Sequence, residues 1–170
     1  MIDFINTILY ILPAYVANSS PVVLGGGDAI DRGAKIGNNR VLGKSKTIMG
    51  FFGGLFAGVL IAAILAYAVE IPFFPSRNYQ LYGGIALSFG TVVGDLAGSF
   101  IKRRMGIEEG KPFILDQFAF LIVALLFAYP FTMIPFYSWD NLLYLAVLTY
   151  VLHIGSNIVA NRLGIKKVPW

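Results

Sequence analysis

One short stretch of the chain holds most of the side chains that could do chemistry. Asp95 lies within an apolar segment that is long enough to cross a bilayer. The polar residues that follow it are Ser99, Lys102, Arg103, Arg104, Lys111 and Asp116. A charged side chain at the centre of a span costs about 2.5–3.5 kcal/mol on insertion scales, so it usually faces a cavity and has a function. Carboxylates beside lysines and arginines at a membrane edge indicate phosphate and metal chemistry.

Helical spacing places several of these residues on one face. They are Ser88, Thr91, Asp95, Ser99 and Lys102, separated by three or four positions. Residues with that spacing share a helix face, and the stripe predicts one wall of a water-filled, ligand-binding cavity. The last apolar segment carries a second stripe: Thr149, His153, Asn157 and Asn161. We interpret the second stripe as hydrogen bonds between helices, each worth about 0.6 kcal/mol.

The chain is too apolar for a soluble domain of its length. Of its 170 residues, 57% are hydrophobic and 13% are charged, and the mean hydropathy is +0.73. We therefore expect an all-α integral membrane protein with a single membrane domain over residues 1–170. A span needs about 20 apolar residues, and five segments qualify: about 2–18, 48–70, 80–100, 114–135 and 141–161. The first is short and contains Pro13, so it requires tilt or local thinning of the bilayer.

Nearly all the cationic residues fall on one side of the predicted membrane. Of the 13 lysines and arginines, only Arg77 lies in a connection on the opposite side. Because cationic loops stay in the cytoplasm, we expect a multi-pass protein of the cell membrane with an outside N-terminus and a cytoplasmic C-terminus. Residues 19–47 and 101–113 then form cytoplasmic loops around a polar cavity, and the first loop is rich in glycine. No Lys or Arg precedes Arg32, which favours a retained first span over a secretory signal peptide.

Composition also limits the chemistry and the partners. The chain has no cysteine, which excludes a disulfide framework and a thiolate ligand or nucleophile. Oxygen ligands or the single histidine must hold any metal ion. The sequence pI of about 9.4 does not indicate a nucleic-acid partner, because basic residues that flank spans set topology and attract anionic membrane lipids.

Small residues recur every fourth position in two of the predicted spans. The second span holds Gly50, Gly54, Gly58 and Ala62, and the third holds Ala86, Gly90, Gly94 and Gly98. Small residues on one face allow two helix backbones to approach closely. We therefore expect the second and third spans to form a tight pair.

The polar stretch resembles a known enzyme signature. Gly94-Asp95, Ser99, Lys102-Arg103 and Asp116 resemble the motif of CTP-dependent cytidylyltransferases that make CDP-activated lipids. Upstream, the chain has Tyr15-Val-Ala-Asn18-Ser-Ser-Pro21, Asp31-Arg-Gly33, Gly43, Lys46-Thr47 and Gly50. These segments are similar to the archaeal CDP-archaeol synthases, which are also short chains with five spans. The resemblance covers residues from about 15 to 120.

The resemblance implies a substrate pair and a set of site residues. The enzyme would transfer CMP from CTP to the phosphate of an isoprenoid ether lipid at the cytoplasmic side, with Mg²⁺ or alternatively Mn²⁺, giving CDP-archaeol and pyrophosphate. Asp95 and Asp116 are the expected metal ligands, and Lys102 and Arg103 are expected to hold triphosphate oxygens. Further candidates are Asp31 for metal, and Asn18, Lys44, Lys46, Ser99 and Lys111 for lipid phosphate or nucleotide.

The chain departs from the wider cytidylyltransferase signature in two places. A Pro-Gly-His-Gly-Gly stretch is replaced by Glu108 to Pro112, and an Asp-Arg-x-x-Asp motif reads Asp116-Gln-Phe-Ala119. The second downstream carboxylate is thus absent, and the ligands of any second metal ion stay open, with Asp28 and Asp31 as substitutes.

Each assignment has a simpler alternative. Asp116 could cap a helix that starts after Pro112, and Lys102, Arg103 and Arg104 could be positive-inside anchors, which is our interpretation of Arg104. For the whole chain the alternatives are a small anion transporter or channel and a structural membrane subunit. The sequence leaves the lipid tails and the oligomeric state open.

Overall fold

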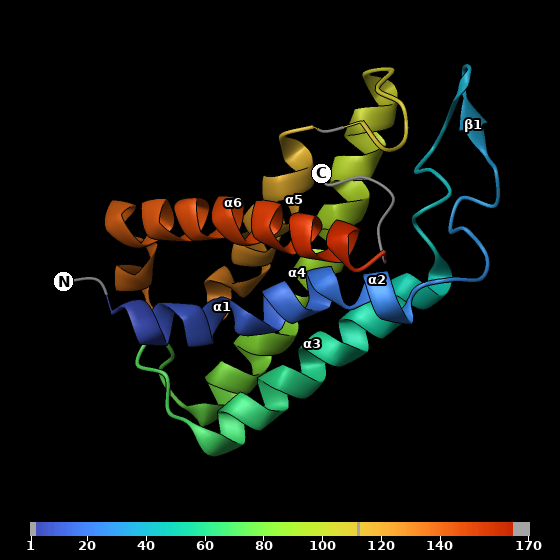
Figure 1. Cartoon of the computed structure of the whole chain (residues 1–170). Helices are drawn as coiled ribbons and strands as arrows, with labels where there is room; N and C mark the ends of the chain where they lie inside the picture. The colour runs from blue at the N-terminus through green and yellow to red at the C-terminus, as the bar shows by residue number, and fades with distance from the viewer. Residues whose placement is uncertain (1–2, 112, 165–170) are drawn as a thin grey trace.

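The protein is a helical bundle with one long polar loop. The computed structural model describes residues 3–111 and 113–164 (Figure 1). Its helices are α1 (Phe4–Ser19), α2 (Pro21–Leu24), α3 (Ile48–Ala68), α4 (Arg77–Arg104), α5 (Leu115–Ala128) and α6 (Trp139–Arg162). Two 3₁₀ turns, η1 (Tyr129–Phe131) and η2 (Ile134–Tyr137), follow α5, and the strands β1 (Lys35–Ile36) and β2 (Asn39–Arg40) form a hairpin in the loop before α3.

Four helical segments are long and apolar enough to cross a membrane. They are Phe4–Leu24, Ile48–Ala68, Arg77–Arg104 and Trp139–Arg162. The predicted span over 114–135 is shorter than expected: α5 has 14 residues, which is about 21 Å of helix. Two 3₁₀ turns replace the α-helix there, and Pro130 and Pro135 are their second residues. Proline lacks the N–H that would continue the α-helix. The count of five spans and their orientation stay predictions.

Helix α4 is longer than the sequence predicted and lies at the centre of the bundle. It contacts α1, α3 and α5 (Figure 1). Ser76 caps its start by accepting a hydrogen bond from the Tyr79 N–H. Its last turn contains Lys102, Arg103 and Arg104, where cations interact favourably with the helix dipole. These three residues therefore belong to a helix end, although the sequence placed them in the loop over 101–113.

The small residues of α3 and α4 make close contacts with more than one neighbouring helix. The expected contact between α3 and α4 is present, because a Cβ at Gly58 would lie 2.6 Å from the Ser88 Oγ. Other small residues of these two helices face α5 and α1. A Cβ atom added to Gly94 in α4 would lie 2.7 Å from the Ala119 carbonyl oxygen of α5. On α3, a Cβ at Gly54 would lie 2.6 Å from the Ala17 carbonyl oxygen of α1. The spacing correctly marked close helix contacts, but it does not say which helix is the partner.

An aromatic cluster closes the bundle at the end away from the polar loop. Tyr10 of α1 packs against Phe74 and Phe136, with ring centroids 5.1 and 3.9 Å away. The Tyr10 and Thr132 hydroxyls are 2.8 Å apart, in hydrogen-bond contact within this buried region. These contacts fix α1 to the connections after α3 and α5, and they leave the opposite end of the bundle for polar residues.

Candidate active site

A cavity of about 950 Å³ opens at the polar end of the bundle. Residues from all six helices and from both polar loops line it. Of the site residues predicted from the sequence, it brings together Asn18, Lys46, Asp95, Ser99, Lys102, Arg103, Lys111 and Asp116. Lys44 and Asp31 are the two predicted residues that do not line it.

Asp95 is held by a lysine from the first loop. The Lys46 ammonium donates hydrogen bonds to both carboxylate oxygens of Asp95, each at 2.7 Å. The Asp95 side chain is 36% exposed, so it stays open to the cavity. The neighbouring Thr47 Oγ1 accepts hydrogen bonds from Gly50 and Gly26 N–H groups at 3.0 and 3.2 Å. This cap fixes the backbone beside Lys46 at the start of α3.

A second ion pair joins α4 to α5. The Lys102 ammonium pairs with the Asp116 carboxylate and also donates a hydrogen bond of 2.5 Å to the Lys111 carbonyl oxygen. Only 7% of the Lys102 side chain is exposed, which does not suit an anchor that faces lipid headgroups. The alternative role of Asp116 was to cap a helix that starts after Pro112, and Pro112 lies outside the described residues. In the structure the Asp116 carboxylate pairs with the Lys102 ammonium.

The two arginines after Lys102 hold the first loop against the end of α4. Arg103 donates from Nε to the Leu42 carbonyl at 3.4 Å and from its guanidinium to the Ile107 carbonyl. Arg104 donates to the Arg40 carbonyl at 2.7 Å and to the Ile36 carbonyl at 3.2 Å. The sequence treated Arg104 as a membrane anchor. In the structure Arg104 also holds the β1–β2 hairpin, a contact between residues far apart in the chain.

Glu109 connects the second loop to the first, and sequence reasoning gave it no role. One carboxylate oxygen accepts hydrogen bonds from the Ser45 N–H at 3.0 Å and from the Ser45 hydroxyl at 3.3 Å. Gly43 approaches the same oxygen so closely that a Cβ would lie 2.6 Å from it, and its φ of +114° disfavours other residues. The two loops thus meet directly beside Lys46.

Asp31 organises the first loop instead of facing the cavity. Its carboxylate pairs with Arg40 and accepts hydrogen bonds from the N–H groups of Gly33, Leu42 and Gly43 at 3.0–3.1 Å. The Arg40 hydrogen bond is the main cause that lowers the pKa of Asp31 well below its usual range. Because both of its carboxylate oxygens accept hydrogen bonds within the loop, Asp31 stabilises the loop fold and is poorly placed to bind a metal ion.

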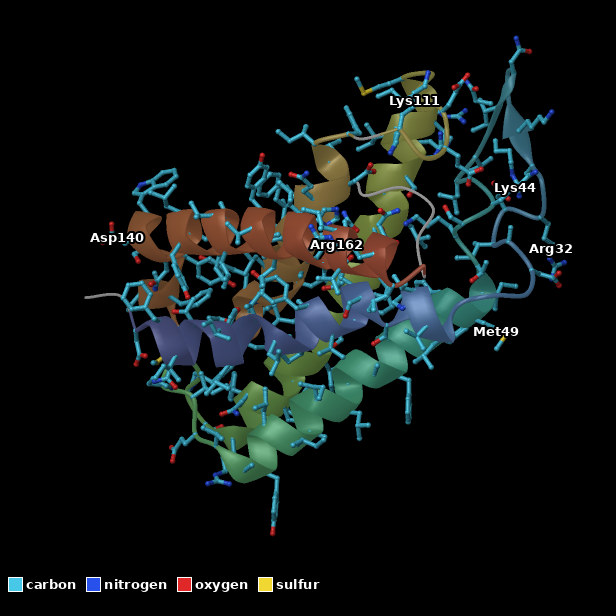
Figure 2. The ribbon with its side chains drawn as sticks, in the orientation of Figure 1. Arg32, Lys44, Met49, Lys111, Asp140 and Arg162 are labelled. Carbon is cyan, nitrogen blue, oxygen red and sulfur yellow. The ribbon has the colours of Figure 1, made fainter. Side chains whose placement is uncertain are left out.

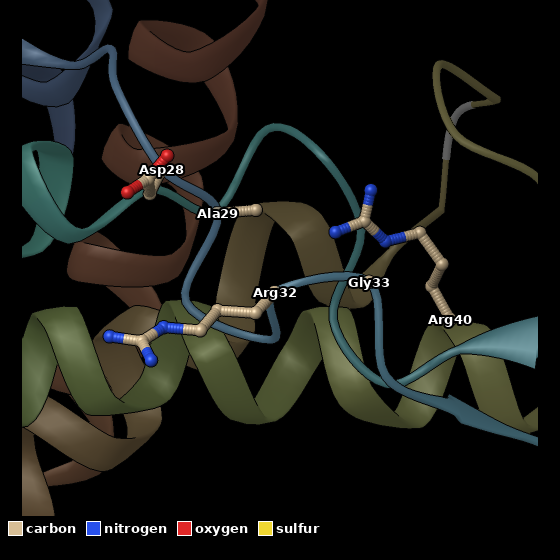
Figure 3. A pocket seen from close by; sticks show the side chains of 5 residues that line it. All are labelled: Asp28, Ala29, Arg32, Gly33 and Arg40. Atoms are coloured by element: carbon tan, nitrogen blue, oxygen red, sulfur yellow. The ribbon is translucent and has the colours of Figure 1, made fainter.

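The candidate substitute Asp28 lies in a separate, open hollow of the same loop. Figure 3 shows this hollow, which has a volume of about 590 Å³ and is lined by Asp28, Ala29, Arg32, Gly33 and Arg40. Asp28 shares this hollow with Arg32 and Arg40, and it is not among the residues that line the main cavity with Asp95 and Asp116. This placement does not support Asp28 as a ligand of a second metal ion in the main cavity.

Helix α6 supplies the remaining wall, so its polar stripe also borders the cavity, in addition to the predicted contact between helices. Thr149 does link helices, because its hydroxyl is 2.8 Å from the Tyr15 hydroxyl of α1. Further along α6, His153, Ser156 and Asn157 line the cavity. The stripe therefore serves helix contact at one end and the cavity at the other.

The donor set of the cavity suits one kind of metal site. Among the described residues, no group of three or more His, Cys, Asp or Glu side chains could enclose an ion. Asp95 and Asp116 nevertheless both line the cavity. Mg²⁺ is commonly bound by one or two carboxylates together with substrate phosphates and water. The residues present fit a divalent ion that is shared with a phosphate substrate.

Comparison with known proteins identifies the family. A family model described as CarS-like CDP-archaeol synthase matches residues 1–170. The chain belongs to the CDP-archaeol synthase family. The CDP-archaeol synthase of Pyrococcus horikoshii is 49% identical over 172 residues, which cover 100% of this chain and 99% of the relative. That of Methanococcus aeolicus is 40% identical over 98% of this chain and 96% of the relative.

A solved structure agrees with this family assignment. It is described as "Structural insight into an intramembrane enzyme for archaeal membrane lipids biosynthesis", and it matches with a TM-score of 0.76. The two chains are 34% identical, and the match covers 89% of this chain and 92% of the other. The chain is therefore an enzyme of the CDP-archaeol synthase family and, with its apolar helices, a multi-pass membrane protein.

Proposed function

We propose that this chain transfers CMP from CTP to the phosphate of 2,3-di-O-geranylgeranylglyceryl phosphate, giving CDP-archaeol and pyrophosphate. The observation that carries the proposal is the cavity at the polar end of the bundle, in which Asp95, Lys46, Lys102 and Asp116 meet. Family membership supplies the substrate pair, because the relatives that match over nearly the whole chain are CDP-archaeol synthases.

The reaction explains why the site needs both acids and bases. A lipid phosphate and a nucleoside triphosphate are both anionic, so the site must offset their repulsion and the charge that develops during transfer. The chemistry that Mg²⁺ or Mn²⁺ supplies there is neutralisation of phosphate charge. Asp95 and Asp116 would hold this ion, and Lys46, Lys102 and Arg103 would bind the phosphate oxygens. Asn18, Ser99 and Lys111 complete the proposed contact set.

The group transfer needs no covalent intermediate with the enzyme. An oxygen of the lipid phosphate forms a bond to the α-phosphorus of CTP, and the bond from that phosphorus to the oxygen bridging the β-phosphate breaks. Pyrophosphate leaves with the bonding electron pair. The attacking phosphate is already anionic near neutral pH, so no side chain has to remove a proton from it. The protein therefore acts by orienting the two phosphates and by placing cations around them.

We place the active site on the cytoplasmic side of a single membrane domain. Figure 2 shows Lys44 and Lys111 at the end of the molecule that carries the polar loops, and Asp140 at the far end of α6. An excess of cations on one side favours a cytoplasmic location for that side. CTP could then enter from the cytosol while the lipid phosphate stays at headgroup depth.

A product assay tests the proposal. Purified protein is incubated with labelled CTP, Mg²⁺ and either the isoprenoid ether lipid phosphate or an acyl ester lipid phosphate. We expect CDP-lipid and pyrophosphate in equal amounts with the ether lipid. If neither lipid gives a CDP product, the proposed function is wrong. The anion-transporter alternative receives no support, because the family model and the relatives reported above are lipid-synthesis enzymes.

A further inference from the structure

Each of the two acids proposed to hold a metal ion is already bound to a lysine. Both oxygens of Asp95 accept hydrogen bonds from Lys46 at 2.7 Å, and Asp116 pairs with Lys102. A divalent ion on either carboxylate would stand next to the ammonium group that now neutralises it. A divalent ion that binds these same oxygens, both on Asp95 and one on Asp116, would displace the lysine ammonium groups from their acids.

The charges around the cavity make this displacement unfavourable for a metal ion alone. The charged lining residues are Lys46, Lys102, Arg103, Lys111, Asp95, Glu109 and Asp116, so cations already outnumber acids. A divalent ion without a counter-anion would add positive charge and leave two ammonium groups without their carboxylates. This matters most for Lys102, whose side chain is 7% exposed, because a buried charge that loses its partner is costly.

A triphosphate removes this difficulty because it brings new acceptors into the same cavity. Lys46 and Lys102 line the cavity with Asp95 and Asp116, so a side-chain rotation is enough to turn each ammonium toward a bound phosphate. The backbone can stay in place: the Thr47 cap fixes the chain beside Lys46, and Lys102 is part of α4.

We infer that the metal ion and the nucleotide bind as a unit, because Lys46 and Lys102 exchange their carboxylate partners for triphosphate oxygens. This inference rests on the proposed function and deepens it. The exchange couples the two binding events, and by linkage the metal raises nucleotide affinity by the same factor as the nucleotide raises metal affinity. Replacing Lys46 frees Asp95, so the metal ion alone binds more tightly and the nucleotide less tightly.

Binding of Mn²⁺ to the purified full chain, followed by electron paramagnetic resonance, tests the exchange without catalysis. Titrations are run with and without a CTP analogue that has a methylene group between the α- and β-phosphorus atoms, and are corrected for the Mn²⁺–analogue complex in solution. For the wild type we expect the analogue to strengthen Mn²⁺ binding at least about 10-fold, within the usual range of coupling. For Lys46→Gln we expect Mn²⁺ alone to bind several-fold more tightly and the coupling to fall by a similar factor.

Lys35→Gln is the matched control, because it removes the same charge from the exposed strand β1, outside the cavity. It should behave like the wild type. Equal Mn²⁺ affinity with and without the analogue in the wild type would overturn the inference, as would identical Mn²⁺ affinities of Lys46→Gln and Lys35→Gln. If Lys46→Gln does not fold, Lys102→Gln makes the same test at Asp116. Formation of CDP-lipid by a protein without this coupling would refute only the exchange, whereas absence of CDP-lipid would refute the proposed function itself.

Discussion

The two walls of the cavity formed by α4 and α6 differ in how firmly the bundle holds them. Helix α4 packs against α1, α3 and α5, and Ser88, Thr91 and Ser99 on its inner face are buried. Helix α6 has only Asn141, Leu145 and Thr149 buried among its described residues, and Ser156, which lines the cavity, is exposed. Side chains that must meet reacting atoms need fixed positions. We therefore expect the α4 wall to carry the chemistry and the α6 wall only to enclose the cavity.

Close contact with α5 is the reason that the α4 wall is firm. Gly90, Gly94 and Gly98 bring the two backbones together, and a Cβ on Gly90 would lie 2.8 Å from the Ala124 Cα. The same contact places the start of α5 beside the end of α4, where Asp116 meets Lys102. Helix packing and the second ion pair of the site thus depend on one row of small residues.

Loss of either proposed metal ligand, Asp95 on α4 or Asp116 at the start of α5, should have the largest effect. We expect Asp95→Asn and Asp116→Asn each to reduce turnover by at least about 10³-fold, the scale found when a single preorganised charge-stabilising group is removed. The amide cannot supply the negative charge that holds a divalent ion. CDP-lipid formation is measured in protein whose helix content matches the wild type. Wild-type rates in both variants would mean that these carboxylates are structural.

Separation of α4 from α5 should have the next largest effect. In Gly94→Leu the new side chain meets backbone atoms of α5, the Ala119 oxygen at 2.7 Å and the Phe120 Cα at 2.8 Å from its Cβ. Overpacking of this kind costs about 1–3 kcal/mol, and we expect a lower melting temperature and a loss of turnover. Gly155→Leu is the control on α6, because a Cβ at Gly155 meets nothing within 4 Å. Equal melting temperatures of the two variants would contradict the difference between the walls.

Weakening the contact between the two polar loops should affect activity less than the two changes above. Glu109→Gln weakens two hydrogen bonds to Ser45, next to Lys46, and bonds to a charged group contribute about 1.5–3 kcal/mol. We expect the KM for CTP to rise about 10-fold with little change in melting temperature.

Glu108→Gln provides the matched control for this loop contact. Glu108 pairs with Lys111 at 3.0 Å, and both side chains are largely exposed. Such surface pairs contribute about 0–1 kcal/mol, so the KM should stay near the wild-type value. A larger rise in the KM for Glu108→Gln than for Glu109→Gln would show that Glu109 does not position the loops.

Removal of a polar group from the α6 wall should have the smallest effect. The Ser156 hydroxyl donates a hydrogen bond of 3.1 Å to the His153 carbonyl within its own helix. For Ser156→Ala we expect kcat and both KM values to change by less than about two-fold, because a single exposed hydrogen bond contributes little. A ten-fold fall in kcat would mean that α6 takes part in the chemistry and that the two walls do not differ as described.

Local patterns in the sequence were informative wherever helical geometry decided the outcome. Thr91, Asp95, Ser99 and Lys102 of the α4 stripe line the cavity together with Asp116, as the helix period and the order of spans predicted. Ser88, the first residue of the stripe, does not line it and is buried. The early end of α5 could also have been predicted from the sequence, because Pro130 and Pro135 interrupt the apolar run.

Contacts between segments far apart in the chain could not be predicted from local sequence patterns. Lys46 meets Asp95 and Ser45 meets Glu109 across 49 and 64 positions of the chain, and each contact depends on how a polar loop folds back over a helix end. Asp31 had the right chemistry for a metal ligand, but the Arg40 side chain and three N–H groups bind it in the folded loop. Residue type alone does not distinguish these two uses of a carboxylate.

The central claim is that Asp95 and Asp116 hold one divalent ion together with the triphosphate of CTP. Anomalous diffraction from crystals grown with Mn²⁺ and the methylene-bridged CTP analogue tests it most directly. We predict a Mn²⁺ peak at bonding distance from both carboxylates and from phosphate oxygens, with the Lys46 and Lys102 ammonium groups turned to the triphosphate. A Mn²⁺–analogue complex bound elsewhere, with both lysines still on their acids, would contradict it.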